Sequence, residues 1–193
     1  MDGNKTLRLL AGSMLTMDYK PFEVECARKG KTIEVDYRID NVTDYTEPVI
    51  TISSASGDSF VGLNIYADEI IMHSQSLKNE DIQSLHTFEG KRTRLALTIL
   101  PDAYGSSGFN LCILYVNGVK NREFTYESND YFAHSGGIVI GSEYADVDIY
   151  GIRVYDSGLT SQGVMTNYIN WLSDINEKTA AKANNDIFDS NGS

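Results

Sequence analysis

The stretch from Asp146 to Ile175 constrains the fold most, because a strand pattern and a helix pattern follow one another there. The first half has the two-residue period of a strand, with Tyr150, Ile152 and Val154 on one face and Gly151, Arg153 and Tyr155 on the other. After the turn cluster 156–158, Thr160 caps a predicted helix with apolar residues at three- and four-residue steps, namely Val164, Tyr168, Leu172 and Ile175. We therefore expect the chain to finish a sheet here and to lay one short helix against it.

Earlier alternations predict that the rest of the chain is strand-rich. Residues 32–40 place Ile33, Val35, Tyr37 and Ile39 on one face and Glu34, Asp36, Arg38 and Asp40 on the other. This strand is predicted to cover a core on one side only. A hairpin is predicted from Phe109 to Tyr126, around Asn117-Gly118. About ten such strands at short spacing predict an all-β fold, a two-sheet antiparallel jelly roll with one short C-terminal helix.

The length of 193 residues, 41% of them hydrophobic, favours one domain over two. We expect an N-terminal lead-in over 1–13, the jelly roll over 14–176, and a polar linker or the start of a downstream segment over 177–193. A strand-like segment followed by an incomplete turn at 186–192 indicates a piece cut from a larger protein. The sequence has no signal-peptide h-region and no apolar run of transmembrane length. A cytoplasmic protein, a virion component and one piece of a longer polypeptide all stay open.

The net charge of −11, with no basic run longer than Lys91-Arg92, disfavours nucleic acid and anionic membranes as partners. A neutral or cationic ligand fits this charge better. Cys26 and Cys112 can in principle pair, but Cys112 lies within an apolar run, which favours a buried free thiol. The three histidines lack the spacing of zinc sites, so no metal site is predicted.

Four short motifs carry a resemblance to a known superfamily. Residues 94–98, 114–118, 138–141 and 149–159 resemble, in order, the strand cores of the concanavalin A-like, laminin G-like superfamily, over roughly residues 14–176. Residues 14–22, 30–34 and the helix ending 170–172 are similar to domains of large structural or tail proteins of bacteriophages. The resemblance implies two curved sheets that bind carbohydrate or protein ligands or, in the glucanase branch, hydrolyse β-glucans.

The sequence Glu34-Val35-Asp36-Tyr37-Arg38 departs from the E-x-D-x-E strand of those glucanases at its third position. A retaining glycosidase needs two carboxyl groups about 5 Å apart, one to attack and one to protonate the leaving oxygen. Arg38 cannot donate a proton at neutral pH, so no residue of this strand fills the acid/base role. We therefore predict no catalytic residue, and we expect these acids to pair across strands with arginines such as Arg94 and Arg153 on an exposed face.

The concave sheet face is the predicted ligand site, with the candidates Glu34, Asp36, Arg38, Arg94, Tyr115, Arg153 and Tyr155. No cofactor is predicted. Some relatives bind calcium, but the turn acids lack EF-hand spacing and are expected to be solvated, namely Asp40, Asp44, Asp58, Asp146 and Asp148.

The leading hypothesis is a non-catalytic module of a phage structural or tail-associated protein, on the virion or another extracellular surface. Its expected partners are a glycan or protein ligand, with adhesion to a host-surface glycan as the purpose, and other structural subunits or domains. The alternatives are a purely structural subunit-contact domain and a glycoside hydrolase.

Overall fold

The computed structural model of the chain describes residues 6–19, 22, 30–56, 59–73, 82–84, 89–102, 109–127 and 135–173. Cys26, Asp58, Ile175 and the segment 177–193, on which predictions were made, lie outside these residues. Within them, no helix combines the length and the apolar character needed to cross a membrane.

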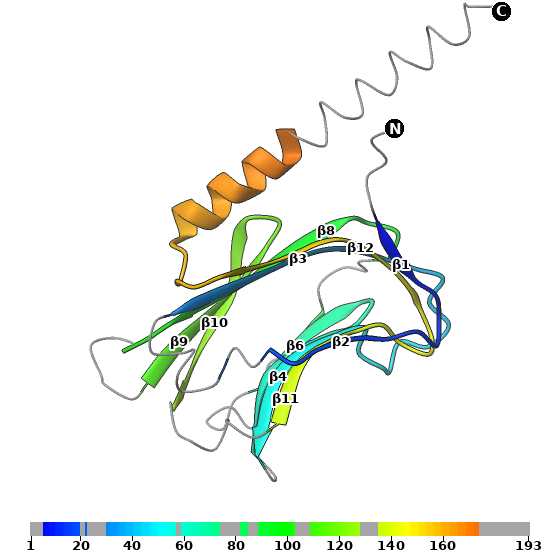
Figure 1. Cartoon of the computed structure of the whole chain (residues 1–193), viewed down its shortest axis with the longest axis horizontal. Helices are drawn as coiled ribbons and strands as arrows, with labels where there is room; N and C mark the ends of the chain where they lie inside the picture. The colour runs from blue at the N-terminus through cyan, green and yellow to red at the C-terminus, as the bar shows by residue number, and fades with distance from the viewer. Residues whose placement is uncertain are drawn as a thin grey trace, which may run out of the picture.

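Two six-stranded antiparallel sheets form the molecule (Figure 1). Sheet A has the order β1 (Leu7–Leu9), β12 (Asp146–Tyr155), β3 (Lys31–Asp40), β8 (Thr93–Leu100), β9 (Phe109–Val116) and β10 (Val119–Glu127). Sheet B has the order β2 (Leu15–Met17), β11 (Ser135–Ile140), β4 (Ile50–Ser56), β5 (Ser59–Ile65), β6 (Glu69–His73) and β7 (Ile82–Ser84). The predicted fold class is confirmed.

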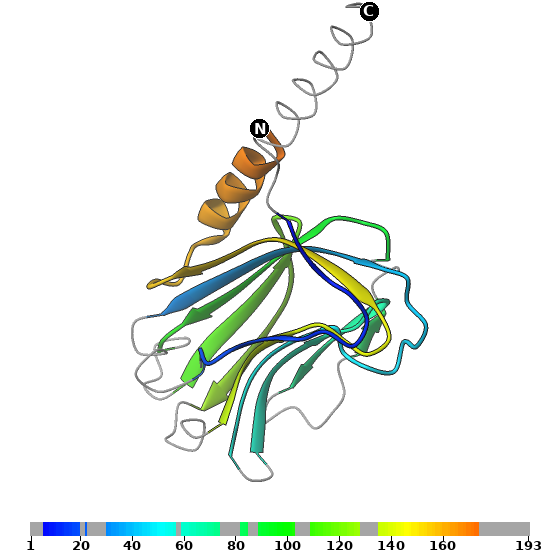
Figure 2. The same ribbon diagram turned by 45° about the vertical axis from the view of Figure 1, so that its right-hand side comes forward.

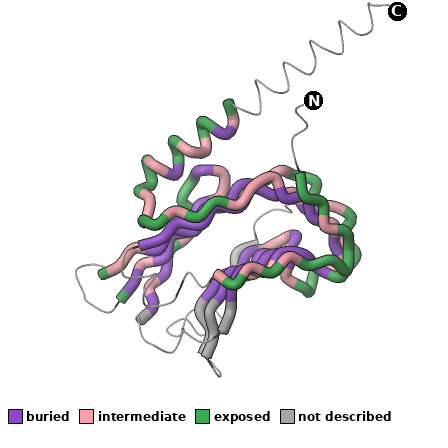
Figure 3. Tube along the Cα trace, in the orientation of Figure 1, coloured by how far each residue is buried: buried purple, intermediate pink, exposed green. Residues whose placement is uncertain are grey.

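The main core lies between the two sheets, where the inner faces of the strands are buried (Figure 3). The predicted apolar face of β3 supplies four of its side chains, Ile33, Val35, Tyr37 and Ile39, each at most 1% exposed. Cys112 is a buried free thiol in the same core, as predicted. Alternate side chains of a strand point to the same face of a sheet, and this explains why every second residue of β3 lies in the core.

A helix over residues 161–173 covers the outer face of sheet A, on the side away from sheet B (Figure 1). Its predicted cap is confirmed, because Thr160 Oγ1 accepts a hydrogen bond of 3.2 Å from the Gly163 N–H. Val164, 2% exposed, packs with Ala96, Ile113 and Tyr115 in a second core cluster. The β9–β10 hairpin is also confirmed, with positive φ angles of 51° at Asn117 and 78° at Gly118.

The prediction that the strand over residues 32–40 covers a core on one side only is wrong, because the helix covers its other face. Glu34 and Asp36 are 2% and 5% exposed, so β3 is buried on both faces over residues 31–37 instead of on one. The alternation correctly separates the apolar face from the charged face. It does not show that the charged face is covered by another element.

The prediction that Tyr150 shares a face with Ile152 and Val154 is also wrong, because β12 contains a β-bulge. The pairing of β12 with β3 shifts register between Ile149 and Gly151, so Tyr150 is an extra residue. Tyr150 is therefore not on the inner face with Ile152; its ring stacks under the Arg92 guanidinium, 3.8 Å from the ring centroid. The other edge of β12 pairs with strand β1, which lies within residues 1–13, the segment expected to be a lead-in.

Candidate functional site

The seven predicted ligand-binding residues all lie in sheet A, on the face that the helix partly covers. Glu34, Asp36, Arg94 and Tyr115 are buried, while Arg38 and Tyr155 are partly exposed and Arg153 is exposed. Binding of a ligand by these residues stays a prediction.

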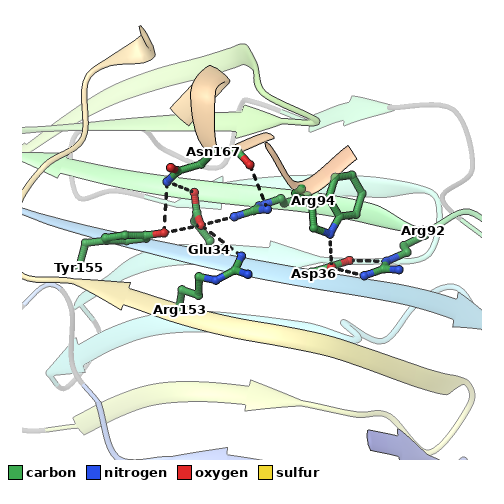
Figure 4. Close-up of polar contacts among 8 residues, drawn as sticks. Glu34, Asp36, Arg92, Arg94, Arg153, Tyr155 and Asn167 are labelled. Carbon is green, nitrogen blue, oxygen red and sulfur yellow. Dashed lines mark hydrogen bonds and ion pairs between the residues drawn. The ribbon is translucent and has the colours of Figure 1, made fainter. Parts of the chain in front are cut away.

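Glu34 is the centre of the group that the structure brings together (Figure 4). Arg94 forms an ion pair with its Oε2, and the Tyr155 hydroxyl donates a hydrogen bond of 3.0 Å to the same oxygen. Asn167 of the helix donates a hydrogen bond from Nδ2 to Glu34 Oε1 at 3.1 Å. The exposed Arg153 places its Nη1 3.8 Å from Glu34 Oε2. The predicted pairing with Arg94 and Arg153 is therefore present, but around a buried carboxylate.

The helix joins this network at two further points. Asn167 Nδ2 also donates to the Tyr155 hydroxyl at 3.2 Å, and its backbone carbonyl accepts from Arg94 Nη1 at 3.4 Å. Burial, and then the hydrogen bond to Glu34, raise the pKa of Tyr155. These contacts fix the helix position with polar groups as well as with the packing of Val164.

Asp36 forms a second group, which the sequence analysis missed in part. Arg92 binds it with two hydrogen bonds, 2.9 Å from Nε and 2.6 Å from Nη2, and Trp171 Nε1 donates to Oδ2 at 2.5 Å (Figure 4). The Arg92 guanidinium lies over the Tyr150 ring and also over the Trp171 ring, 5.1 Å from the centroid of the latter. Trp171 packs onto the sheet and is 8% exposed.

The other two predicted residues lie apart from these groups. Arg38 forms ion pairs of 2.8 Å with both Asp40 and Asp148. The Tyr115 hydroxyl bonds to Ser161 Oγ at 2.9 Å, where the helix begins. A signal for the missed Asn167 exists in the sequence, since it falls on the inward helix stripe with Val164 and Trp171.

Four of the five turn acids have partners within the protein, namely Asp40, Asp44, Asp146 and Asp148. The expectation of solvation is wrong for Asp148, which is 7% exposed, and Asp58 lies outside the described residues. Asn41, the Ala11 N–H and Arg8 all donate to Asp146 and lower its pKa. Asp44 accepts from the backbone N–H and hydroxyl of Thr46 at 2.8 and 2.7 Å. No group of three or more His, Cys, Asp or Glu side chains in the described part of the chain is arranged to hold a metal ion.

A separate pocket of about 260 Å³ lies where the chain passes between the sheets. The crossings at 10–14, 41–49 and 141–145 lie at the same end of the sandwich (Figure 2). All three contribute to the lining, which consists of Met14, Glu47, Pro48, Gly141, Ser142, Glu143 and Tyr144. No sequence pattern pointed to this pocket, because its residues come from three separate turns.

Several solved structures that are similar to the chain are receptor-binding domains of botulinum neurotoxins. The serotype G binding domain matches with a TM-score of 0.51 at 12% identity, over 89% of this chain and 47% of that one. The receptor-binding domain of the C/D mosaic serotype matches with a TM-score of 0.54 at 16% identity, over 86% and 42%. The binding domain of neurotoxin DC in complex with SialylT matches with a TM-score of 0.50 at 12% identity, over 87% and 47%.

The chain thus spans less than half the length of these structures. At these identities the likeness shows the fold, a β-sandwich, and not the function. No protein-family model matches the chain, and no curated protein matches it in sequence.

Proposed function

We propose that the chain is a non-catalytic binding module that recognises a glycan or a protein ligand. The observation that carries this proposal is the state of Glu34 and Asp36, the two acids of the glucanase-like strand. Each is buried beneath the helix and bound by an arginine, Arg94 for Glu34 and Arg92 for Asp36. A β-glucan cannot reach carboxylates in this position.

Hydrolysis would also need a carboxyl group that can approach the glycosidic oxygen. A retaining mechanism needs one carboxyl group to remain protonated while the other attacks. Here both carboxylates accept hydrogen bonds from an arginine beneath the helix, so neither is free to approach a glycosidic oxygen. We therefore expect no release of reducing sugar from β-glucans by the native protein. Release that disappears in Glu34→Gln would contradict this expectation.

The likeness of the fold to receptor-binding domains supports a binding role. One of those domains, the binding domain of neurotoxin DC, was solved both with SialylT and with rat synaptotagmin II. The phage-like segments at 14–22, 30–34 and 170–172 support a place in a structural or tail-associated protein. In this proposal the module lies on a virion or another extracellular surface and serves adhesion.

A purely structural role is the second candidate, because the helix of this same chain covers the face predicted to bind the ligand. A glycan array followed by titration calorimetry separates the two candidates. Saturable binding of a glycan supports the binding module. Absence of binding across a wide panel of glycans and candidate protein receptors would leave the structural role.

A further inference from the structure

We propose that the pocket between the three crossings binds a single neutral sugar ring, held by Glu47, Ser142, Glu143 and Tyr144. This inference rests on the proposed function and names its ligand class and its site. The site differs from the sheet face predicted from the sequence, which the helix covers. It is formed by turns at one end of the sandwich, where a rigid scaffold commonly presents binding residues.

The polar groups of the pocket are suited to hydroxyl groups. Glu47 and Glu143 are exposed and make no ion pair or hydrogen bond with any described residue, so both carboxylates can accept hydrogen bonds from a ligand. Ser142 is 4% exposed, and its Oγ accepts from the Tyr144 N–H at 3.1 Å. Among the described residues this hydroxyl has no acceptor for its own hydrogen.

A ligand in this pocket therefore meets two carboxylates that accept hydrogen bonds and the Ser142 hydroxyl, which can donate one. A sugar hydroxyl can do both, since it donates one hydrogen bond and accepts others. An ammonium group only donates, and it would leave the Ser142 hydrogen unmatched. Met14, Pro48 and the half-buried Tyr144 add apolar surface of the kind that packs against the C–H face of a sugar ring.

The size and charge of the pocket narrow the ligand class. A volume of about 260 Å³ is below the range of roughly 300 to 1,000 Å³ typical of drug-sized ligands, so it fits one ring better than a folded oligosaccharide. Two carboxylates line it, and the lining residues include no lysine or arginine. Sialic acids, uronic acids and sulfated sugars would be repelled by these like charges.

Backbone hydrogen bonds hold the pocket walls in place. The Gly12 N–H donates to the Ser142 carbonyl at 2.9 Å, the Thr43 N–H to the Tyr144 carbonyl at 2.8 Å, and the Gly141 N–H to the Val49 carbonyl at 2.9 Å. At Gly141, with φ of 118°, there is no space for a Cβ, because such an atom would lie 2.1 Å from the Ser13 carbonyl oxygen. The crossings are thus fixed to one another before a ligand arrives, which lowers the entropic cost of binding.

The test is calorimetric titration of the whole chain with methyl glycosides of glucose, galactose, mannose and N-acetylglucosamine, and with sialic and glucuronic acids. We expect at least one neutral glycoside to bind and the two acids not to bind. The double variant Glu47→Gln with Glu143→Gln, and separately Tyr144→Ala, should weaken binding about tenfold or more. Glu123→Gln, an exposed glutamate of β10 outside the pocket, is the matched control and should bind like the native chain.

Binding of a neutral glycoside that is equally strong in all four proteins would overturn the pocket assignment while leaving the proposed function intact. Binding of the acidic sugars at comparable strength would overturn the ligand class. If no glycoside binds the native chain, both the inference and the glycan form of the proposed function are lost. Thermal unfolding of each variant shows whether the weaker binding comes from loss of the fold.

Discussion

Neutralising Glu34 should destabilise the protein strongly, because the carboxylate is buried together with the guanidinium that it binds. Glu34 and Arg94 have side chains that are 2% and 4% exposed. Glu34→Gln keeps the size of the side chain but leaves the Arg94 cation without its counter-charge. Removing one partner of a buried ion pair typically costs about 3 to 5 kcal/mol of unfolding free energy.

For a chain of 193 residues this loss corresponds to a fall in Tm of roughly 6 to 20 °C. Urea unfolding followed by far-UV circular dichroism measures the free energy, and an unchanged slope against urea concentration shows that the two-state description still applies. The control is Glu123→Gln, which removes an ion pair of 2.7 Å to Lys120 whose side chains are 38% and 48% exposed. This exposed pair should contribute no more than about 1 kcal/mol.

A double-variant cycle tests whether the effect belongs to the pair. Arg94→Met alone should cost a similar amount, because it leaves Glu34 buried and less well paired. The combination of Glu34→Gln with Arg94→Met should cost clearly less than the sum of the two single changes. A loss below about 1 kcal/mol for Glu34→Gln, or additive effects in the cycle, would refute the buried position of this pair beneath the helix.

Three further predictions concern the hairpin and the core. Gly118→Ala should destabilise the protein more than Gly12→Ala in urea unfolding. Both glycines have positive φ, but only at Gly118 would a Cβ lie 2.8 Å from Tyr168. Equal losses of unfolding free energy would mean that the hairpin does not touch the helix. Burial raises the pKa of Tyr37, so above about pH 10 the unfolded chain releases a proton that the folded chain keeps. The free energy of unfolding should therefore fall by about 1.4 kcal/mol per pH unit in this range. Tyr37→Phe should remove this contribution to the pH dependence of stability. Alkylation of Cys112 at pH 8, followed by peptide mass mapping, should be negligible until denaturant is added, because burial raises the pKa of its thiol; rapid labelling of the native protein would contradict its core position.

The main features of the fold could be predicted from the sequence because they depend on local geometry. The alternation along residues 32–40 correctly separates the buried apolar side chains from the charged ones. Asn117-Gly118 predicts its hairpin because both residues tolerate positive φ, and Thr160 predicts its helix start because its hydroxyl can accept a free N–H. Each of these signals needs only residues that are close together in the chain.

The candidate sites depend on contacts between distant parts of the chain, and the sequence shows these only in part. Pairing of Glu34 with Arg94 could be expected from neighbouring strands, but the burial of that pair comes from a helix more than 120 residues after Glu34. The extra residue at Tyr150 reverses the alternation in β12, and a two-residue period contains no signal for such a bulge.

The sequence by itself therefore determined an all-β chain, the inward face of residues 32–40 and the position of its one described helix, because period, turn and cap are properties of neighbouring residues. Only the tertiary structure decided that the charged face is covered and that the open pocket lies at the crossings. Met14, Glu47 and Glu143 belong to three turns without a common motif, and they meet because the two sheets fix where those turns lie. Packing of one element on another determines which polar groups remain accessible to a ligand. Patterns of neighbouring residues in the sequence do not indicate this packing.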